Sequence, residues 1–434
     1  MAILDTLRNA WTTKSIRNKI IFTLLMLLIF RVGAHIPVPF IDRDALQQMF
    51  QGEGTATMMM FLNTFSGGAL KNFSVFALSI IPYVTSSIIM NLLTVVIPAL
   101  GRLAKEGDDG RRKITQYTRY GTVILGFVQG MGFTVGMMRG FLTVPQGALM
   151  IPTYVLIALV LTAGTAFLMW LGEQITEKGV GNGISLIIFA GIVAGIPDVV
   201  KNLVPDVFSG VIAWYQAILL LVIGTVLIAG VVFVQEGQRK IPVQYAKRVV
   251  GRKVYGGQST HIPLKVNQAG VIPLIFGFSI INFPMIIGSW FPQGGRASEF
   301  IGTWLTMSAK LEAIPFLLFF AFLIVFFTYF YTGITFNPVD VADNLKKHGG
   351  FIPGIRPGRP TSDYLSKILT RVTLAGGVFL AAIALLPILI QVVTNIENAQ
   401  IGGTSLLIVV SVALDTMKQL ESQLLQRNYS GFIK

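Results

Sequence analysis

The chain has 434 residues, of which 53% are hydrophobic and only 12% are charged, and its formal net charge is +14. Soluble domains carry roughly 25% charged residues, so a soluble fold with this composition would expose large apolar patches. This excludes a cytosolic enzyme and a disordered chain, and the absence of cysteine removes disulfides and thiolate chemistry. The class that remains is an all-α polytopic membrane protein, because a β-barrel would alternate in short segments instead of forming long apolar runs.

Ten apolar runs between charged residues are predicted to span the membrane as helices. They are Ile20–Phe40, Asn72–Gly101, Tyr120–Met138, Gly140–Gly172, Gly179–Pro197, Val207–Gln235, Val266–Gly295, Ala313–Val339, Val372–Ile396 and Asn398–Leu414. Of the 34 Lys and Arg residues, 27 lie in the two termini and the loops on their side of the membrane, and 5 lie in the opposite loops. The positive-inside rule therefore predicts that both termini are cytoplasmic.

The ten spans divide into two groups of five. An odd number of spans per half forces opposite orientations, which predicts an inverted repeat made of an N-terminal half, 1–200, and a C-terminal half, 201–434. Inverted repeats are common in transport proteins, with the pathway at the interface between the repeats.

One further apolar run, Gly54–Leu70, is too short to span and ends just before the second predicted span. Segments of this length are more often re-entrant or interfacial, and non-helical backbone at membrane depth needs protein or water around it. Two interpretations stand: the segment at about 58–70 enters an internal cavity from the outer side, or it lies on the outer leaflet.

The spans contain almost no ionisable residue. Arg31 and His35 lie toward the outer end of the first span, and neither the phosphate-binding GxxxxGK[ST] motif nor the hydrolytic HExxH or GxSxG motif occurs. Ion-coupled transporters place charged residues inside their spans. The sequence therefore predicts a conduit powered by another component, with no enzymatic activity, no cofactor and no metal site.

Two cytoplasmic loops, 236–265 and 337–371, are long and basic. The prolines and glycines of the second loop predict a fixed, non-helical shape, with Arg356 at a turn tip. Basic loops bind phosphate-rich partners such as RNA, although the positive-inside rule alone also produces basic loops.

Within the spans, Gly126 and Gly130 are spaced for close helix packing. Aliphatic pairs at i,i+4, such as Ile80 with Val84, are by spacing alone ordinary packing or lipid-facing residues. Polar side chains inside apolar spans must face other helices or water, and interhelical hydrogen bonding is their simplest interpretation.

Several long motifs resemble the bacterial SecY family, the channel subunits of Sec protein translocons. The motifs are NTFSGGAL (63–70), WLGEQITEKGVGNGIS (170–185), QSTHIPLKVNQAGVIP (258–273), ADNLKKHGGFIPGIRPG (342–358) and GGTSLLIVV (402–410). The resemblance covers nearly the whole chain. It implies an hourglass pore between two five-helix halves, with a short re-entrant plug helix that closes the pore from outside.

The resemblance assigns roles to particular residues. The aliphatic pore ring is implied at Ile80, Val84, Ile184, Ile188, Ile275 and Ile408. The plug is implied at Phe61, Leu62, Asn63, Thr64, Phe65, Ser66, Gly67 and Gly68. A lateral gate that opens toward lipid is implied at Ser87, Asn91, Gln129, Ser279 and Asn282.

The two basic loops resemble docking sites for the SecA motor and the ribosome. The docking residues implied are Arg239, Lys240, Lys247, Arg248, Arg252, Lys253, Lys346, Lys347, Arg356 and Arg359. SecE is implied as a clamp around both halves and SecG as a peripheral subunit. The energy would come from SecA, the ribosome or the proton-motive force, and the location would be the bacterial plasma membrane.

The leading hypothesis is therefore a passive, gated channel for unfolded secretory polypeptides that also releases signal sequences and transmembrane segments into lipid. A secondary transporter for a small solute is a rival class, which would need a charged coupling residue inside a span. A membrane scaffold that docks ribosomes without conducting polypeptide is a third.

Overall fold

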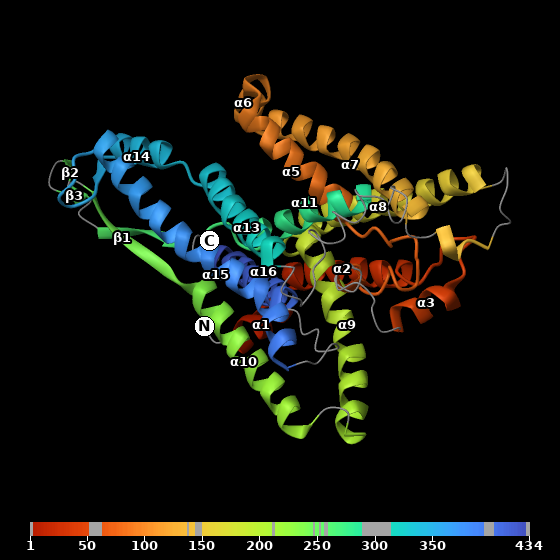
Figure 1. Cartoon of the computed structure of the whole chain (residues 1–434). Coiled ribbons are helices and arrows are strands. Elements are labelled where there is room, and N and C mark those ends of the chain that lie inside the picture. The colour runs from red at the N-terminus through yellow and green to blue at the C-terminus, as the bar shows by residue number, and fades with distance from the viewer. Residues whose placement is uncertain are drawn as a thin grey trace. The chain divides into compact units, whose positions relative to one another are not determined.

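A computed structural model of the chain describes residues 3–51, 63–136, 139–143, 150–210, 213–245, 248–250, 253–255, 259–288, 314–394 and 403–430. Most of these residues are helical (Figure 1). The helices are α1 (Ile3–Thr12), α2 (Lys14–Gly33), α3 (Arg43–Gln51), α5 (Ile81–Val96), α6 (Pro98–Lys105), α7 (Asp108–Gly136), the 3-10 turn η1 (Arg139–Phe141), α8 (Met150–Lys178), α9 (Gly183–Phe208), α10 (Trp214–Glu236), α11 (Ile272–Gly288), α13 (Ile314–Thr335), α14 (Pro338–Lys347), α15 (Arg359–Thr394) and α16 (Gly403–Ser430). The strands are β1 (Gln238–Tyr245), β2 (Arg248–Val250), β3 (Lys253–Tyr255), β4 (Ser259–Lys265) and β5 (Gly350–Phe351).

The chain forms two compact units. The first comprises Met1–Ile218, Phe278–Phe316 and Ile408–Lys434, and the second comprises Leu219–Gly277 and Leu317–Leu407. These units are defined by the contacts between residues, whereas the predicted halves 1–200 and 201–434 are defined by a proposed inverted repeat. The division into repeats stays a prediction.

Several helices have the length and composition of membrane spans. Among the described residues, four stretches are long and apolar enough to cross a membrane: within α8, within α10, across α13 and α14, and within α15. The pair α5 and α6, bent by 102°, would make a fifth if it forms one broken span. The bend falls at Ile97, which is extended because a residue before proline avoids the helical region. The membrane class is thereby supported, and the count of ten spans stays a prediction.

In the first unit, small residues let α7 pack closely on α8. A β-carbon on Gly130 would lie 3.3 Å from the α-carbon of Ala158, and one on Gly126 would lie 3.6 Å from the Thr162 side chain. The spacing-based interpretation of these glycines as packing residues is confirmed. Helix α7 also bonds to α5: the Ser86 hydroxyl donates to the Thr118 carbonyl oxygen over 2.8 Å, an interhelical hydrogen bond of the expected kind.

Residues 66–80 form successive turns within the first unit, so the prediction of a helix from Asn72 onward is wrong. The backbone pairs instead with the segment after α2: the amide of Val75 donates to Ile36 over 3.0 Å, and the amide of Val38 donates to Phe73 over 3.0 Å. Positive φ angles at Phe73 and Ser79 also interrupt any helix. The helix starts only at Ile81, with Pro82 in its first turn.

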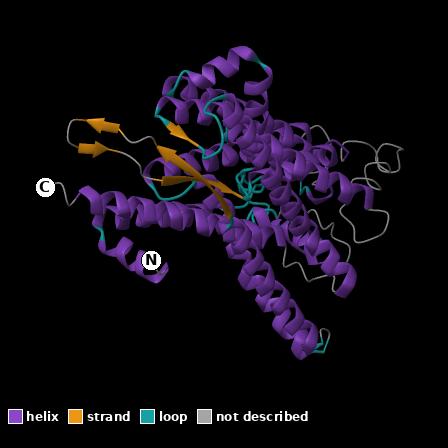
Figure 2. Ribbon diagram, turned by 90° about the vertical axis from the view of Figure 1, so that its left-hand side faces the viewer, coloured by secondary structure: helices purple, strands orange, loops and turns teal. Residues whose placement is uncertain are grey.

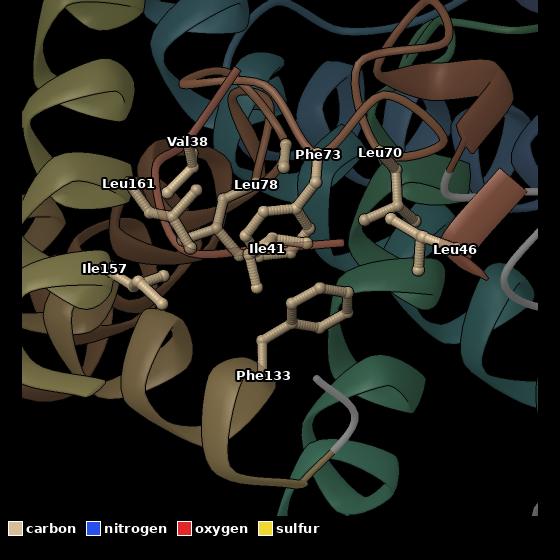
Figure 3. Packing of buried hydrophobic residues seen from close by; sticks show 10 residues of the cluster. Val38, Ile41, Leu46, Leu70, Phe73, Leu78, Phe133, Ile157 and Leu161 are labelled. Carbon is tan, nitrogen blue, oxygen red and sulfur yellow. The ribbon is translucent and has the colours of Figure 1, made fainter. Parts of the chain in front are cut away.

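This turn segment is buried in an apolar core. Figure 3 shows Leu70, Phe73 and Leu78 of the segment packed with Val38, Ile41, Leu46, Phe133 and two α8 side chains, Ile157 and Leu161. The sequence did not reveal this backbone, because an apolar run has the same composition whether it is helical or turned.

The second unit carries the chain's described sheets, drawn as orange arrows in Figure 2. Strand β1 pairs antiparallel with β4 from Gln238↔Lys265 to Gln244↔Ser259, and its end also pairs with β5 at Gln244↔Phe351. The basic loop 236–265 is thus a β-hairpin, and β5 of the other basic loop extends the same sheet. A shared core lies beneath, formed by Ile241, Val243, Leu264, Leu345, Ile352, Leu365 and Ile368.

The second basic loop is not wholly non-helical as predicted, because α14 occupies 338–347. The Asn337 side chain accepts from the amide of Val339 at the start of this helix, Pro338 fits its first turn, and Lys346 and Lys347 occupy its last turn. These are ordinary start and stop signals of a helix, and they outweigh the proline and glycine content of the residues that follow.

Candidate functional site

The buried turn that runs from Asn63 to Leu70, called here the 63–70 turn, belongs to the segment predicted as a plug. Its backbone is held by its own side chains: the Asn63 side chain accepts from the amide of Lys71 over 2.8 Å, and the Ser66 hydroxyl accepts from the amide of Leu70 over 3.1 Å. Gly67 and Gly68 have positive φ angles, which glycine adopts without strain. The turn is therefore a defined structure and not an unstructured connection.

The turn contacts helix α9 backbone to backbone. A β-carbon on Gly191 would lie 2.9 Å from the carbonyl oxygen of Phe65 and 3.2 Å from the amide nitrogen of Gly67. Contacts under 3.0 Å are essentially never made by real β-carbons. Any side chain at Gly191 would therefore displace the turn.

Helix α2 contacts the same turn at Gly67 through a charged donor. The guanidinium of Arg31 donates to the carbonyl oxygen of Gly67 over 2.7 Å. Arg31 is partly buried. Among the residues that the structure describes, the one ion pair joins Arg119 to Glu173, so Arg31 has no carboxylate partner in that part of the chain.

Two further contacts, both made by Phe65, surround the turn. The Ser79 hydroxyl donates to the Phe65 carbonyl oxygen over 3.4 Å, and the Phe65 ring lies 6.2 Å from the Phe278 ring of α11 between ring centroids. Phe65, Ser66 and Leu70 are buried. The turn is thus enclosed by parts of α2, α9 and α11 within the first unit.

The six predicted ring residues are distributed over four helix regions. Ile80 lies at the end of the turn segment, Val84 in the first turn of α5, Ile184 and Ile188 one turn apart on α9, Ile275 on α11 and Ile408 on α16. Ile80, Val84, Ile188 and Ile408 are buried, and Ile184 and Ile275 are partly buried. Ile275 belongs to the second unit and the other five belong to the first. The ring stays a prediction.

The predicted gate residues come from three helices. Ser87 and Asn91 are partly buried on α5, Gln129 is buried on α7, and Ser279 is buried on α11. Asn282 also lies on α11, but its side chain is outside the described residues, as are plug residues Phe61 and Leu62. The gate assignment stays a prediction.

The predicted docking residues lie on the second unit. Arg239 and Lys240 on β1, Lys346 and Lys347 on α14, and Arg356 and Arg359 beside the start of α15 are all exposed. Arg248 and Lys253 lie on β2 and β3, and Lys247 and Arg252 lie outside the described residues. These six exposed cations lie on one folded unit, and we refer to them as the basic surface; clustered cations attract a polyanionic or acidic partner.

Arg356 is presented by a fixed turn. Its carbonyl oxygen accepts a hydrogen bond from the hydroxyl of buried Thr361 over 2.8 Å, while its side chain is exposed. Gly354 and Gly358 flank it with φ angles of +82° and +103°. Arg356 thus lies between two short turns, at 353–354 and 357–358, with its backbone held and its side chain exposed.

Sequence reasoning did not assign a role to Arg31, Gly191 or the β1–β5 pairing. The signal for Arg31 was a lone charge in an apolar run, which in a membrane protein indicates a functional residue. The close approach at Gly191 and the strand pairing are contacts between distant segments, and a single sequence carries no direct signal for them. No cluster of three or more metal-ligating side chains occurs within the described ranges.

The chain was then compared with known proteins. It matches the SecY family over residues 74–417. It is 51% identical over 437 residues to a protein of Halalkalibacterium halodurans named Protein translocase subunit SecY, with 99% of each chain covered. The chain therefore belongs to the SecY family.

Solved structures share its fold. One, described as the structure of a protein conducting channel, gives a TM-score of 0.66 at 21% identity and covers 93% of this chain and 91% of its own. Another, described as showing that the plug domain of the SecY protein stabilises the closed state of the translocation channel, gives 0.64 at 18% identity and covers 93% of this chain and 91% of its own. At these identities the likeness establishes the fold.

Proposed function

We propose that this chain is the protein-conducting subunit of a bacterial protein translocase. It passes unfolded secretory polypeptides across the plasma membrane and holds both termini in the cytoplasm. Family membership over nearly the whole chain supports this proposal. The structural observation that carries it is the 63–70 turn, in which residues 63–65 are helical and residues 66–70 are not. Non-helical backbone at membrane depth is tolerated only where protein surrounds it or a water-filled cavity adjoins it. Such a turn, enclosed by apolar helices, fits a plug that can leave its place when a substrate enters.

The proposed channel has ten spans in two inverted halves, with an aliphatic ring at its waist. The ring would consist of Ile80, Val84, Ile184, Ile188, Ile275 and Ile408. A narrow aliphatic constriction blocks ions by excluding water, yet it needs no fixed polar contact and so can deform around any passing sequence. The plug, at about 58–70, would close this constriction from the outer side.

A lateral gate would release signal sequences and transmembrane segments into lipid. The proposed gate lies between α5, which carries Ser87 and Asn91, and α11, which carries Ser279 and Asn282. Gln129 on the neighbouring α7 would also belong to it. Polar side chains hold helices together in an apolar medium by interhelical hydrogen bonds of modest strength, about 0.6–2 kcal/mol each. Such bonds suit a gate that must open reversibly.

The driving component would dock on the basic surface of the second unit. SecA and the ribosome are the proposed occupants, SecE and SecG the proposed membrane partners, and the proton-motive force a further energy source. The exposed cations of β1, α14 and the Arg356 turn support this, since ribosomal RNA is a polyanion. The shared sheet and core of the two loops give the surface a fixed shape.

Protein translocation by the purified chain tests the proposal. The chain would be reconstituted with SecE in vesicles, with SecA, ATP and a secretory precursor outside. We expect precursor to become protected from added protease in an ATP-dependent manner. Saturable uptake of a small solute without precursor uptake would favour a secondary transporter, and precursor binding without protection would favour a docking scaffold.

A further inference from the structure

We propose that Arg31 and Gly191 help to hold the 63–70 turn in its closed position, in addition to the contacts made by Ser79 and Phe278. Arg31 acts as a polar latch and Gly191 as the place where the turn rests on α9. This inference rests on the proposed function, in which the turn belongs to the plug, and it adds the residues on which the resting state of the channel depends.

The latch is a single charge-assisted hydrogen bond between two distant segments. The Arg31 guanidinium donates to the Gly67 carbonyl oxygen over 2.7 Å, within the usual range for a charged donor. The Gly67 carbonyl belongs to a buried turn, so loss of the donor would remove its contact with α2. Among the described residues the Arg31 guanidinium forms this hydrogen bond and no ion pair.

The contact with α9 is steric. The turn approaches the helix backbone at Gly191 so closely that a methyl group there would lie 2.9 Å from the Phe65 carbonyl oxygen. One helical turn further along, a β-carbon on Gly195 would have no neighbour within 4 Å. The same Gly→Ala change on the same helix should therefore displace the turn at one position and leave it in place at the other.

These two contacts differ in kind, which makes them independent tests. Arg31→Met removes the donor while keeping a long side chain, and Arg31→Lys restores a charged donor. The His35 ring lies 2.8 Å from the main-chain oxygen of Arg31, and this contact does not require the guanidinium. Gly191→Ala leaves Arg31 intact and adds one carbon, and Gly195→Ala is its matched control.

Two measurements on the chain reconstituted with SecE would test the inference. The first is the resting ion conductance in planar bilayers without precursor. The second is the rate at which a maleimide reagent labels a thiol introduced by Ser66→Cys, since the chain has no native cysteine. Because the Ser66 hydroxyl itself bonds within the turn, this substitution is present in every variant and in the reference chain, so that its own effect is common to all. Ser66 is 1% exposed, so the thiol should be protected while the turn is seated.

We expect Arg31→Met and Gly191→Ala each to raise both the conductance and the labelling rate by about tenfold. A tenfold change corresponds to about 1.4 kcal/mol in the free-energy difference between the closed and open states. Arg31→Lys should recover most of the protection, and Gly195→Ala should match the wild type. If either Arg31→Met or Gly191→Ala leaves both readouts at the wild-type value, the inference is overturned.

Precursor uptake by the same vesicles separates this inference from the proposed function. If the wild-type chain translocates precursor while the variants stay closed and protected, the latch is wrong and the channel stands. If the wild-type chain translocates nothing, the proposed function itself fails.

Discussion

A polar substitution at Ile188 should shift the resting channel toward its open state. Ile188 lies on α9 and is 2% exposed. Ile188→Asn would place an amide where an aliphatic side chain is now enclosed, and burying such a group without partners costs about 1–3 kcal/mol in proteins. If water reaches this position only when the channel opens, that cost falls on the closed state, and the open-to-closed ratio should rise by roughly 5–150-fold.

The assay is resting conductance in planar bilayers, with translocation measured in parallel to show that the channel still assembles. Ile196→Asn is the matched control, because Ile196 lies two turns further along α9 and is 47% exposed. We expect a marked leak from Ile188→Asn and wild-type conductance from Ile196→Asn. Equal conductance of both variants would refute the assignment of Ile188 to the constriction.

Three further predictions concern docking and packing. Arg356→Glu should weaken SecA-driven precursor uptake several-fold without reducing co-purification with SecE. Lys367→Glu, the same charge reversal at another exposed residue on α15, should leave uptake unchanged. Equal uptake by both variants would remove Arg356 from the docking surface. Gly130→Leu should lower the free energy of unfolding by about 1–3 kcal/mol, because the larger side chain overpacks the α7–α8 contact. The measurement is the midpoint of thermal unfolding in detergent, which should fall; an unchanged midpoint would contradict the packing described. A double-mutant cycle on Arg119 and Glu173 should give a coupling free energy of at most about 1 kcal/mol that falls with added salt, because the Arg119 side chain is half exposed. A larger coupling that does not change with salt would contradict this and show that the pair is shielded from solvent.

The sequence predicts the helices that are long and uniformly apolar. Predicted spans at Gly140–Gly172, Val207–Gln235 and Ala313–Val339 correspond to α8, α10 and α13, with ends shifted by several residues. In these runs hydropathy is sufficient, because a membrane helix satisfies its own backbone and needs no distant partner.

Prediction fails where the backbone is satisfied by a distant segment. Residues 72–80 read as the start of a span, yet hydrogen bonds between Val75 and Ile36 and between Val38 and Phe73 replace those of a helix. Likewise, the two basic loops appear as separate features in the sequence, and the pairing of Gln244 with Phe351 joins them across more than a hundred residues. Neither pairing has a local signature in composition or periodicity.

The candidate site shows the same division. Asn63, Ser66 and Gly67 were found through a motif, because the local turn needs those residue types for its hydrogen bonds and its positive φ angle. Gly191 was not found, since its importance lies in what approaches it from another segment. Arg31 was noticed as a lone charge, but the carbonyl that it contacts could not be read from its neighbours in sequence.

Site-specific photo-crosslinking during translocation tests the central claim most directly. A secretory precursor would be stalled halfway through the chain reconstituted with SecE and SecA, with a photo-crosslinker at Ile408 or, as control, at Leu221, an α10 side chain that is 70% exposed. The channel account predicts precursor adducts at Ile408 and none at Leu221. Bound precursor that forms no adduct at Ile408 would contradict a polypeptide pathway through the proposed ring.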